Sequence, residues 1–256
     1  MKNLLHLLAS NRRQATPRAL ETQGDETTLY IYDAIVSDDL TADWCGGVSA
    51  QTIVPQIRAI KGGTLHIRIS SPGGDVFAAQ AIVAAMRDTG AKVIAHIDGF
   101  AASAATVIAT AADEVEISDG ALYMIHCAWS VAFGNASDMR ESAALLDKVD
   151  GTIVAQYAKR TGMEAGAVKA LMDAETWMTA QEAVDAKFCD RIAVCADAPE
   201  AKWDLTAYAN APKVTAPAPK VEPETLPAPD LPPAITQEHR DRQAQRMRDL
   251  DRKQIR

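Results

Sequence analysis

The stretch DGFAASAATVIATAADE, residues 98–114, decides the fold, because it joins a predicted strand to a run of small residues. Its alanines allow a helix to pack closely against a sheet. Ser103 lies in the middle, with two alanines on each side. Considered without its partners, Ser103 could be a small residue that fits a buried helix. A position at the mouth of that helix would instead suit a nucleophile, provided that a base and oxyanion donors lie nearby.

Strand and helix patterns alternate around this stretch. Apolar and β-branched runs predict strands, and apolar residues at steps of three and four predict helices. The expected strands are residues 28–36, 64–70, 91–99, 113–118 and 121–126, and the expected helices are 48–60, 75–90 and 101–112. Pro55 predicts a late start or a disturbed first turn in the first of these helices. Such alternation predicts an α/β fold with right-handed crossovers and a mostly parallel sheet.

Helical patterns dominate the next part of the chain. Asn135 is a good N-cap for a long amphipathic helix, with Asp138 in its first turn. Two capping boxes, Thr161 with Glu164 and Thr179 with Glu182, predict short helices over residues 162–172 and 180–186.

Composition divides the chain into four parts. Residues 1–25 are predicted to form a flexible arm and residues 26–209 the globular domain. Residues 210–236 are predicted to be a proline-rich linker, and residues 237–256 a charged tail. Eight of the 12 prolines lie between Pro212 and Pro233, a segment unable to bury a core. The charged tail is either solvated or a docking peptide.

Charge and cysteine content exclude several classes of function. The net charge of −8 lacks the basic signature of a nucleic-acid binder. The four cysteines form no CxxC pair, so we expect no zinc site, no other metal and no cofactor. Reduced thiols are the default, which favours a cytoplasmic location. Neither a signal peptide nor a membrane span is predicted, because the apolar runs are too short.

A base for Ser103 must come from five histidines. His6 and His239 lie in the tails, and His66 and His96 lie inside predicted strands. His126 ends a strand, where active-site residues of a mainly parallel sheet tend to emerge. A buried structural histidine is the alternative explanation for His126.

The segment ISSPGGDVF, residues 69–77, supplies backbone groups that could stabilise an oxyanion. Gly73 and Gly74 can adopt positive φ and expose their N–H groups at a strand-to-helix junction. The same pair could simply form a turn. No G-x-S-x-G surrounds Ser103, and neither a P-loop nor GxGxxG is present.

Together, the blocks SPGG, GFAASAA, MIH, the long helix and DAETWMTAQEAV resemble the proteolytic subunits of the Clp proteases (the ClpP family) over residues 28–194. WCGGVSA, HIDGFAASAA, GNASDM and ETWMTAQEA most resemble the phage branch, the ClpP-related head maturation proteases. The resemblance implies a ClpP/crotonase-type spiral of ββα units, with a long interface helix and subunits stacked in rings.

The resemblance also assigns roles. It implies Ser103 as nucleophile, His126 as general base, and the N–H groups of Gly74 and Ala104 as oxyanion donors. Asp173 matches the family's acid if a gap of two residues is allowed before Trp177, and Glu175 matches more closely without it. The sequence favours Asp173, and Glu175 is the alternative.

The implied function is that of a serine endopeptidase, in particular a phage head (prohead) maturation protease. Its expected substrates are scaffold, portal or coat proteins in the bacterial host cytoplasm, inside the procapsid. No counterpart of the family's ATPase-binding loops is visible in residues 1–25, so an ATPase partner is not expected. The tail could dock on the capsid or be removed by self-cleavage. A housekeeping ClpP subunit with an ATPase and a crotonase-type acyl-CoA enzyme are the alternatives.

Overall fold

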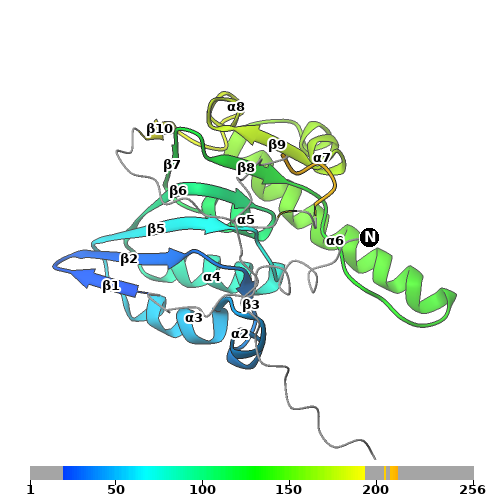
Figure 1. The fold of residues 1–256 in the computed structure, drawn as a ribbon, viewed down its shortest axis with the longest axis horizontal. Helices are drawn as coiled ribbons and strands as arrows, with labels where there is room; N and C mark the ends of the chain where they lie inside the picture. Colours follow the sequence, from blue (N-terminus) through cyan, green and yellow to red (C-terminus); the bar gives the residue numbers. More distant parts are fainter. Residues whose placement is uncertain (1–19, 194–204, 206–207, 213–256) are drawn as a thin grey trace, which may run out of the picture. The chain divides into compact units, whose positions relative to one another are not determined.

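The computed structural model describes residues 20–193, 205 and 208–212, all within the first of two compact units, Met1–Val214. Figure 1 shows the arrangement of its elements. The strands are β1 Leu20–Gln23, β2 Glu26–Ile31, β3 Ile35–Val36, β4 Val48–Ser49, β5 Thr64–Ser71, β6 Lys92–Ala102, β7 Glu114–Ser118, β8 Leu122–Ile125, β9 Thr176–Thr179 and β10 Arg191–Ala193. The helices are α2 Asp39–Cys45, α3 Ala50–Ala59, α4 Val76–Asp88, α5 Ala104–Ala109, α6 Ala136–Thr161, α7 Ala165–Asp173 and α8 Ala180–Asp185.

The main sheet has the order β1-β2-β5-β6-β7-β10, and β8 pairs with both β6 and β9. All pairs from β2 through β10 along this order are parallel, whereas β1 pairs antiparallel with β2. The predicted α/β class with a mostly parallel sheet is therefore confirmed. None of the described helices combines the length and the apolar character needed to cross a bilayer.

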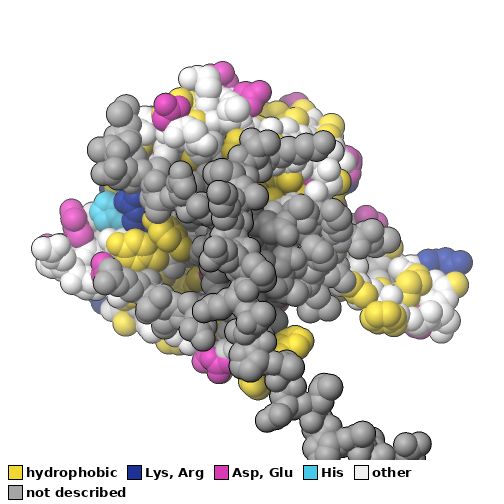
Figure 2. All heavy atoms as spheres, in the orientation of Figure 1, with side chains coloured by type: hydrophobic (Ala, Val, Ile, Leu, Met, Phe, Trp, Pro, Cys, Tyr) yellow, Lys and Arg dark blue, Asp and Glu magenta, His cyan; other side chains and the backbone are white. Residues whose placement is uncertain are grey.

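The main sheet has one apolar and one polar face. In β5, Leu65, Ile67 and Ile69 are fully buried and belong to the core shared with α3, α4 and α5. His66 and Arg68 alternate with them and point to the opposite face, as the period of two in a strand requires. Figure 2 shows a histidine and basic side chains beside apolar ones near the position of β5.

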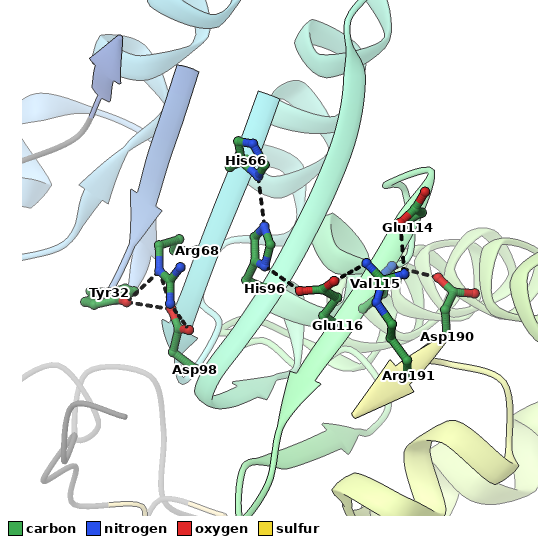
Figure 3. A network of polar contacts seen from close by, with 10 residues as sticks. All are labelled: Tyr32, His66, Arg68, His96, Asp98, Glu114, Val115, Glu116, Asp190 and Arg191. Atoms are coloured by element: carbon green, nitrogen blue, oxygen red, sulfur yellow. Dashed lines mark hydrogen bonds and ion pairs between the residues drawn. The ribbon is translucent and has the colours of Figure 1, made fainter. Parts of the chain in front are cut away.

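The polar face carries a chain of hydrogen bonds (Figure 3). His66 Nδ1 lies 3.0 Å from His96 Nε2, and His96 Nδ1 lies 2.9 Å from Glu116 Oε2. Burial lowers the pKa of His96, although the neighbouring Glu116 carboxylate opposes that change. The two histidines lie inside β5 and β6, as the sequence predicts, and hydrogen-bond to each other and to Glu116, whereas the Ser103 hydroxyl is paired with His126.

Two sequence-based boundaries near the start of the chain are wrong. Residues 20–23, assigned to the flexible arm, form β1, because the two-residue turn at Gly24 and Asp25 closes a hairpin with β2. Helix α3 begins at Ala50, two residues after the predicted start, because Val48–Ser49 form β4 and pair with β3; the helix then runs through Pro55. Pro55 is exposed, so water can bind the carbonyl that lacks its helical donor.

The helices later in the chain test the capping predictions. The capping boxes at Asn135 and Thr179 are present. The box at Thr161 is not: its hydroxyl donates back to Tyr157 O at 2.8 Å. Helix α6 ends where Gly162 adopts the left-handed conformation, and α7 begins at Ala165. The helix predicted over residues 101–112 is shorter, because β6 continues to Ala102.

Candidate active site

Ser103 lies at the junction between β6 and α5. β6 ends one residue before Ser103, and α5 begins one residue after it. Its φ of 56° and ψ of −125° are strained for a residue with a side chain, at a cost of about 1–3 kcal/mol. Its N–H donates to Met124 O at 2.9 Å and its carbonyl accepts from Thr106 N at 2.9 Å, which hold this conformation. The turn resembles a nucleophile elbow, although the G-x-S-x-G sequence is missing.

The alanines around Ser103 let the backbone pack closely. Ala101, Ala102, Ala104 and Ala105 are at most 1% exposed. Larger side chains at these positions would have to displace the sheet or the helices that cover it. The alanines therefore fix the Ser103 backbone, while Ser103 itself is partly exposed.

His126 reaches Ser103 because two parallel strands end together. β8 pairs in parallel with the end of β6, with Ala102 opposite Met124, so the residues that follow both strands emerge at the same edge. His126 Nε2 lies 2.7 Å from Ser103 Oγ. That distance suits a general base that takes the serine proton.

Burial lowers the pKa of His126 below the ordinary histidine value of 6.5, with the negative charges of Glu175 and Asp150 opposing the change. His126 is consequently neutral at pH 7. A neutral imidazole is the form that can accept the Ser103 proton.

The Gly73–Gly74 loop packs against the Ser103 turn. A Cβ added to Gly73, which has a φ of 88°, would lie 2.5 Å from Ala102 O and 2.8 Å from Ala104 N. Only glycine permits so close an approach. The loop therefore lies directly beside the predicted nucleophile.

The same loop orients the N–H of Gly74. Ile35 N donates to Gly73 O at 2.8 Å, and Asp75 N donates to Ile35 O at 2.9 Å. Because the C=O and the N–H of one trans peptide point in opposite directions, the N–H of Gly74 points away from Ile35. Ala104 is the first residue of α5, so its N–H has no acceptor within the helix. The N–H of Gly74 thus points away from Ile35, and the N–H of Ala104 is not used by a hydrogen bond within α5.

The two candidate acids have different neighbours. Asp173 Oδ1 lies 2.5 Å from Lys169 Nζ and 3.2 Å from Cys127 Sγ, and its side chain is 58% exposed. Glu175 accepts hydrogen bonds from the backbone N–H groups of Ala209 and Asn210. Within the residues that the structure describes, no carboxylate is hydrogen-bonded to His126.

Sequence reasoning missed two residues near His126. Asp150 is 6% exposed, and its carboxylate accepts from Ala128 N at 2.7 Å, which fixes the backbone just after His126. The sequence signal for Asp150 was an acidic residue next to the apolar stripe of the long helix. The rings of Tyr208 and His126 make a T-shaped contact, with their centroids 5.4 Å apart. Because Tyr208 lies beyond every motif, no local pattern indicated its position.

Comparison with known proteins gives the class. A model of the Clp protease family matches residues 40–195, which is more than half of the chain. The chain belongs to the Clp protease family, and it is a serine-type peptidase.

Three relatives show the extent of the similarity. The ATP-dependent Clp protease proteolytic subunit of Bacteroides fragilis is 32% identical over 182 residues, which cover 68% of this chain and 88% of that protein. Subunit 1 from Leifsonia xyli subsp. xyli is 31% identical over 130 residues, 50% of this chain and 66% of that protein. The Streptococcus pneumoniae subunit is 33% identical over 132 residues, 50% of this chain and 67% of that protein. The chain therefore spans just under two thirds of the Leifsonia protein.

Proposed function

We propose that this protein is a phage-type head maturation protease, a serine endopeptidase that trims scaffold, portal or coat proteins inside a procapsid in the bacterial cytoplasm. The observation that supports peptidase chemistry is the distance of 2.7 Å between His126 Nε2 and Ser103 Oγ. The phage role is supported by the sequence blocks around Cys45, Ser103 and Trp177, and by the proline-rich extension that follows the family match.

The proposed mechanism is acyl transfer through Ser103. His126 takes the hydroxyl proton, and Ser103 Oγ attacks the scissile carbonyl. The N–H groups of Gly74 and Ala104 stabilise the oxyanion. His126 then gives the proton to the leaving amine, and water hydrolyses the acyl-enzyme.

The substrate is proposed to bind as an extended strand. Gly73 O and Asp75 N are bonded to Ile35, so the N–H of Gly74 is directed to the other side of the loop. The carbonyl of Pro72 is the neighbouring acceptor that we propose for the substrate. A peptide strand could pair with these groups and present its scissile bond to Ser103.

Assembly into rings is part of the proposal. Val131, Phe133 and Leu145 lie just before or within α6 and are 49%, 88% and 53% exposed. Figure 2 shows apolar side chains at the projecting end of α6. Exposed apolar side chains gathered on one element mark a surface for protein contact.

A housekeeping subunit that works with an ATPase is the second candidate, favoured by the names of the three relatives. The two roles differ in their need for an unfoldase. We expect the wild-type protein, without any ATPase, to shorten the proteins of an unprocessed phage shell, and Ser103→Ala to leave them intact. Gel electrophoresis and intact-mass measurement would read the outcome. Cleavage that requires an added ATP-driven unfoldase would favour the housekeeping role.

The identity of the acid is a separate prediction. Asp173 is the sequence-based choice, but the electrostatics of this conformation favour Glu175, because its charge acts most strongly on His126. If Glu175 stabilises the His126 imidazolium, Glu175→Gln lowers kcat by about 10²–10⁴-fold, and Asp173→Asn changes it by less than about tenfold. Steady-state hydrolysis of a peptide by both variants decides between them. The reverse order of effects would support Asp173.

A further inference from the structure

A segment beyond the family match covers the active site. The ring of Tyr208 makes T-shaped contacts with the rings of His126 and Trp177, at centroid distances of 5.4 Å and 5.7 Å. Its hydroxyl donates to Pro72 O. Leu205 is 9% exposed and packs against Phe100 and Met124 at the ends of β6 and β8.

The same segment engages Glu175. Ala209 N donates to Oε2 at 3.1 Å, and Asn210 N donates to Oε1 at 2.6 Å. Asn210 Nδ2 also donates to Ala174 O at 2.9 Å. These bonds hold the carboxylate toward the segment, so its lone pairs are partly occupied and less available to His126.

The hydrogen bond from Tyr208 to Pro72 lies where the substrate is proposed to bind. The carbonyl of Pro72 and the N–H of Gly74 are the groups through which an extended substrate would pair with this loop. The Tyr208 hydroxyl already occupies the carbonyl of Pro72. Tyr208 and an incoming peptide strand therefore compete for the same acceptor.

We propose that Leu205 and residues 208–211, here named the C-terminal cap, form an intramolecular cap that restrains the peptidase. The cap covers His126, occupies the Pro72 carbonyl and holds Glu175. Displacement or removal of the cap opens the substrate position. The proposal requires a reactive Ser103 and is independent of the phage role. Its arm through Tyr208 does not depend on the identity of the acid, whereas its arm through Glu175 rests on Glu175 acting on His126.

The test uses the full-length chain. Tyr208→Ala is expected to increase the rate at which a fluorophosphonate acylates Ser103 by about tenfold or more, the factor for a contact of about 1.4 kcal/mol. Because His126 loses part of its burial, the acid limb of the pH–rate profile moves upward toward 6.5. Tyr30→Ala, which removes a ring on β2 with contacts to Tyr32 and Glu21, is the matched control and leaves both values unchanged.

A second variant and a peptide sharpen the result. Ala209→Pro removes one N–H from Glu175 at an exposed position, and acylation should again become faster. A synthetic peptide LTAYANAP, residues 205–212, should slow acylation of Tyr208→Ala, and the same peptide with alanine in place of tyrosine should not.

Several outcomes would overturn the cap. Circular dichroism first establishes that each variant is folded. Unchanged or slower acylation in folded Tyr208→Ala and Ala209→Pro would make the segment a permanent part of the site. Absence of reaction in the folded wild type and in both variants would also overturn it, because cap release must expose a reactive Ser103. Failure to process phage proteins, with acylation still faster in the variants, would count against the phage role alone.

Discussion

Replacing Ser103 with alanine is expected to lower kcat for peptide hydrolysis by about 10⁶-fold, the loss seen when a serine nucleophile is removed. His126 would lie beside a methyl group, and no acyl-enzyme could form. The fold should survive, because alanine at the same strained φ keeps the backbone bonds to Met124 and Thr106. Labelling by a fluorophosphonate and hydrolysis of a fluorogenic peptide measure the effect.

Ser142→Ala provides the matched control. Ser142 is partly exposed on α6, and its hydroxyl donates within the helix to Asp138 O at 2.8 Å. Full activity is expected in this variant. Hydrolysis that persists in Ser103→Ala at the wild-type rate would assign the chemistry to another group, and turnover of an acyl-CoA thioester by that variant would favour a crotonase-type reaction.

The largest expected effect on stability is at Arg68. Asp98 is 3% exposed, and Arg68 contacts both of its carboxylate oxygens, with Nε 3.0 Å from Oδ2 (Figure 3). Tyr32 also donates to Oδ2 at 2.5 Å, and burial together with this bond raises the pKa of Tyr32 to about 12. Arg68→Ala leaves a buried carboxylate without its cation, and we expect the free energy of unfolding to fall by about 3–5 kcal/mol.

A surface ion pair serves as the comparison. Arg58 Nε lies 3.2 Å from Asp88 Oδ2, but the two side chains are 55% and 58% exposed. Arg58→Ala should therefore change the free energy of unfolding by at most about 1 kcal/mol. Urea denaturation of both variants tests the difference. Equal effects would show that the Asp98 carboxylate is not stabilised mainly by Arg68.

Prediction from sequence was most successful where local chemistry decides. Asn135 and Thr179 cap helices through neighbours three residues away, so their patterns are visible in the sequence. Two predictions based on local patterns were wrong. Thr161 presents the same capping pattern, but its hydroxyl bonds back to Tyr157. Gly24 lies in the turn of a hairpin that apolar periodicity does not indicate. The parallel class of the sheet followed from the alternation of strands and helices.

The sequence by itself determined the alternation of the central strands and helices, the family, and a serine and a histidine at the ends of two strands. Only the tertiary structure decided the left-handed conformation of Ser103, the neighbours of Asp173 and Glu175, and the place of Tyr208. These features depend on contacts between residues far apart in the chain, such as Tyr208 with Pro72 and Asp150 with Ala128. Local propensity does not encode such contacts, because packing of the whole domain selects them.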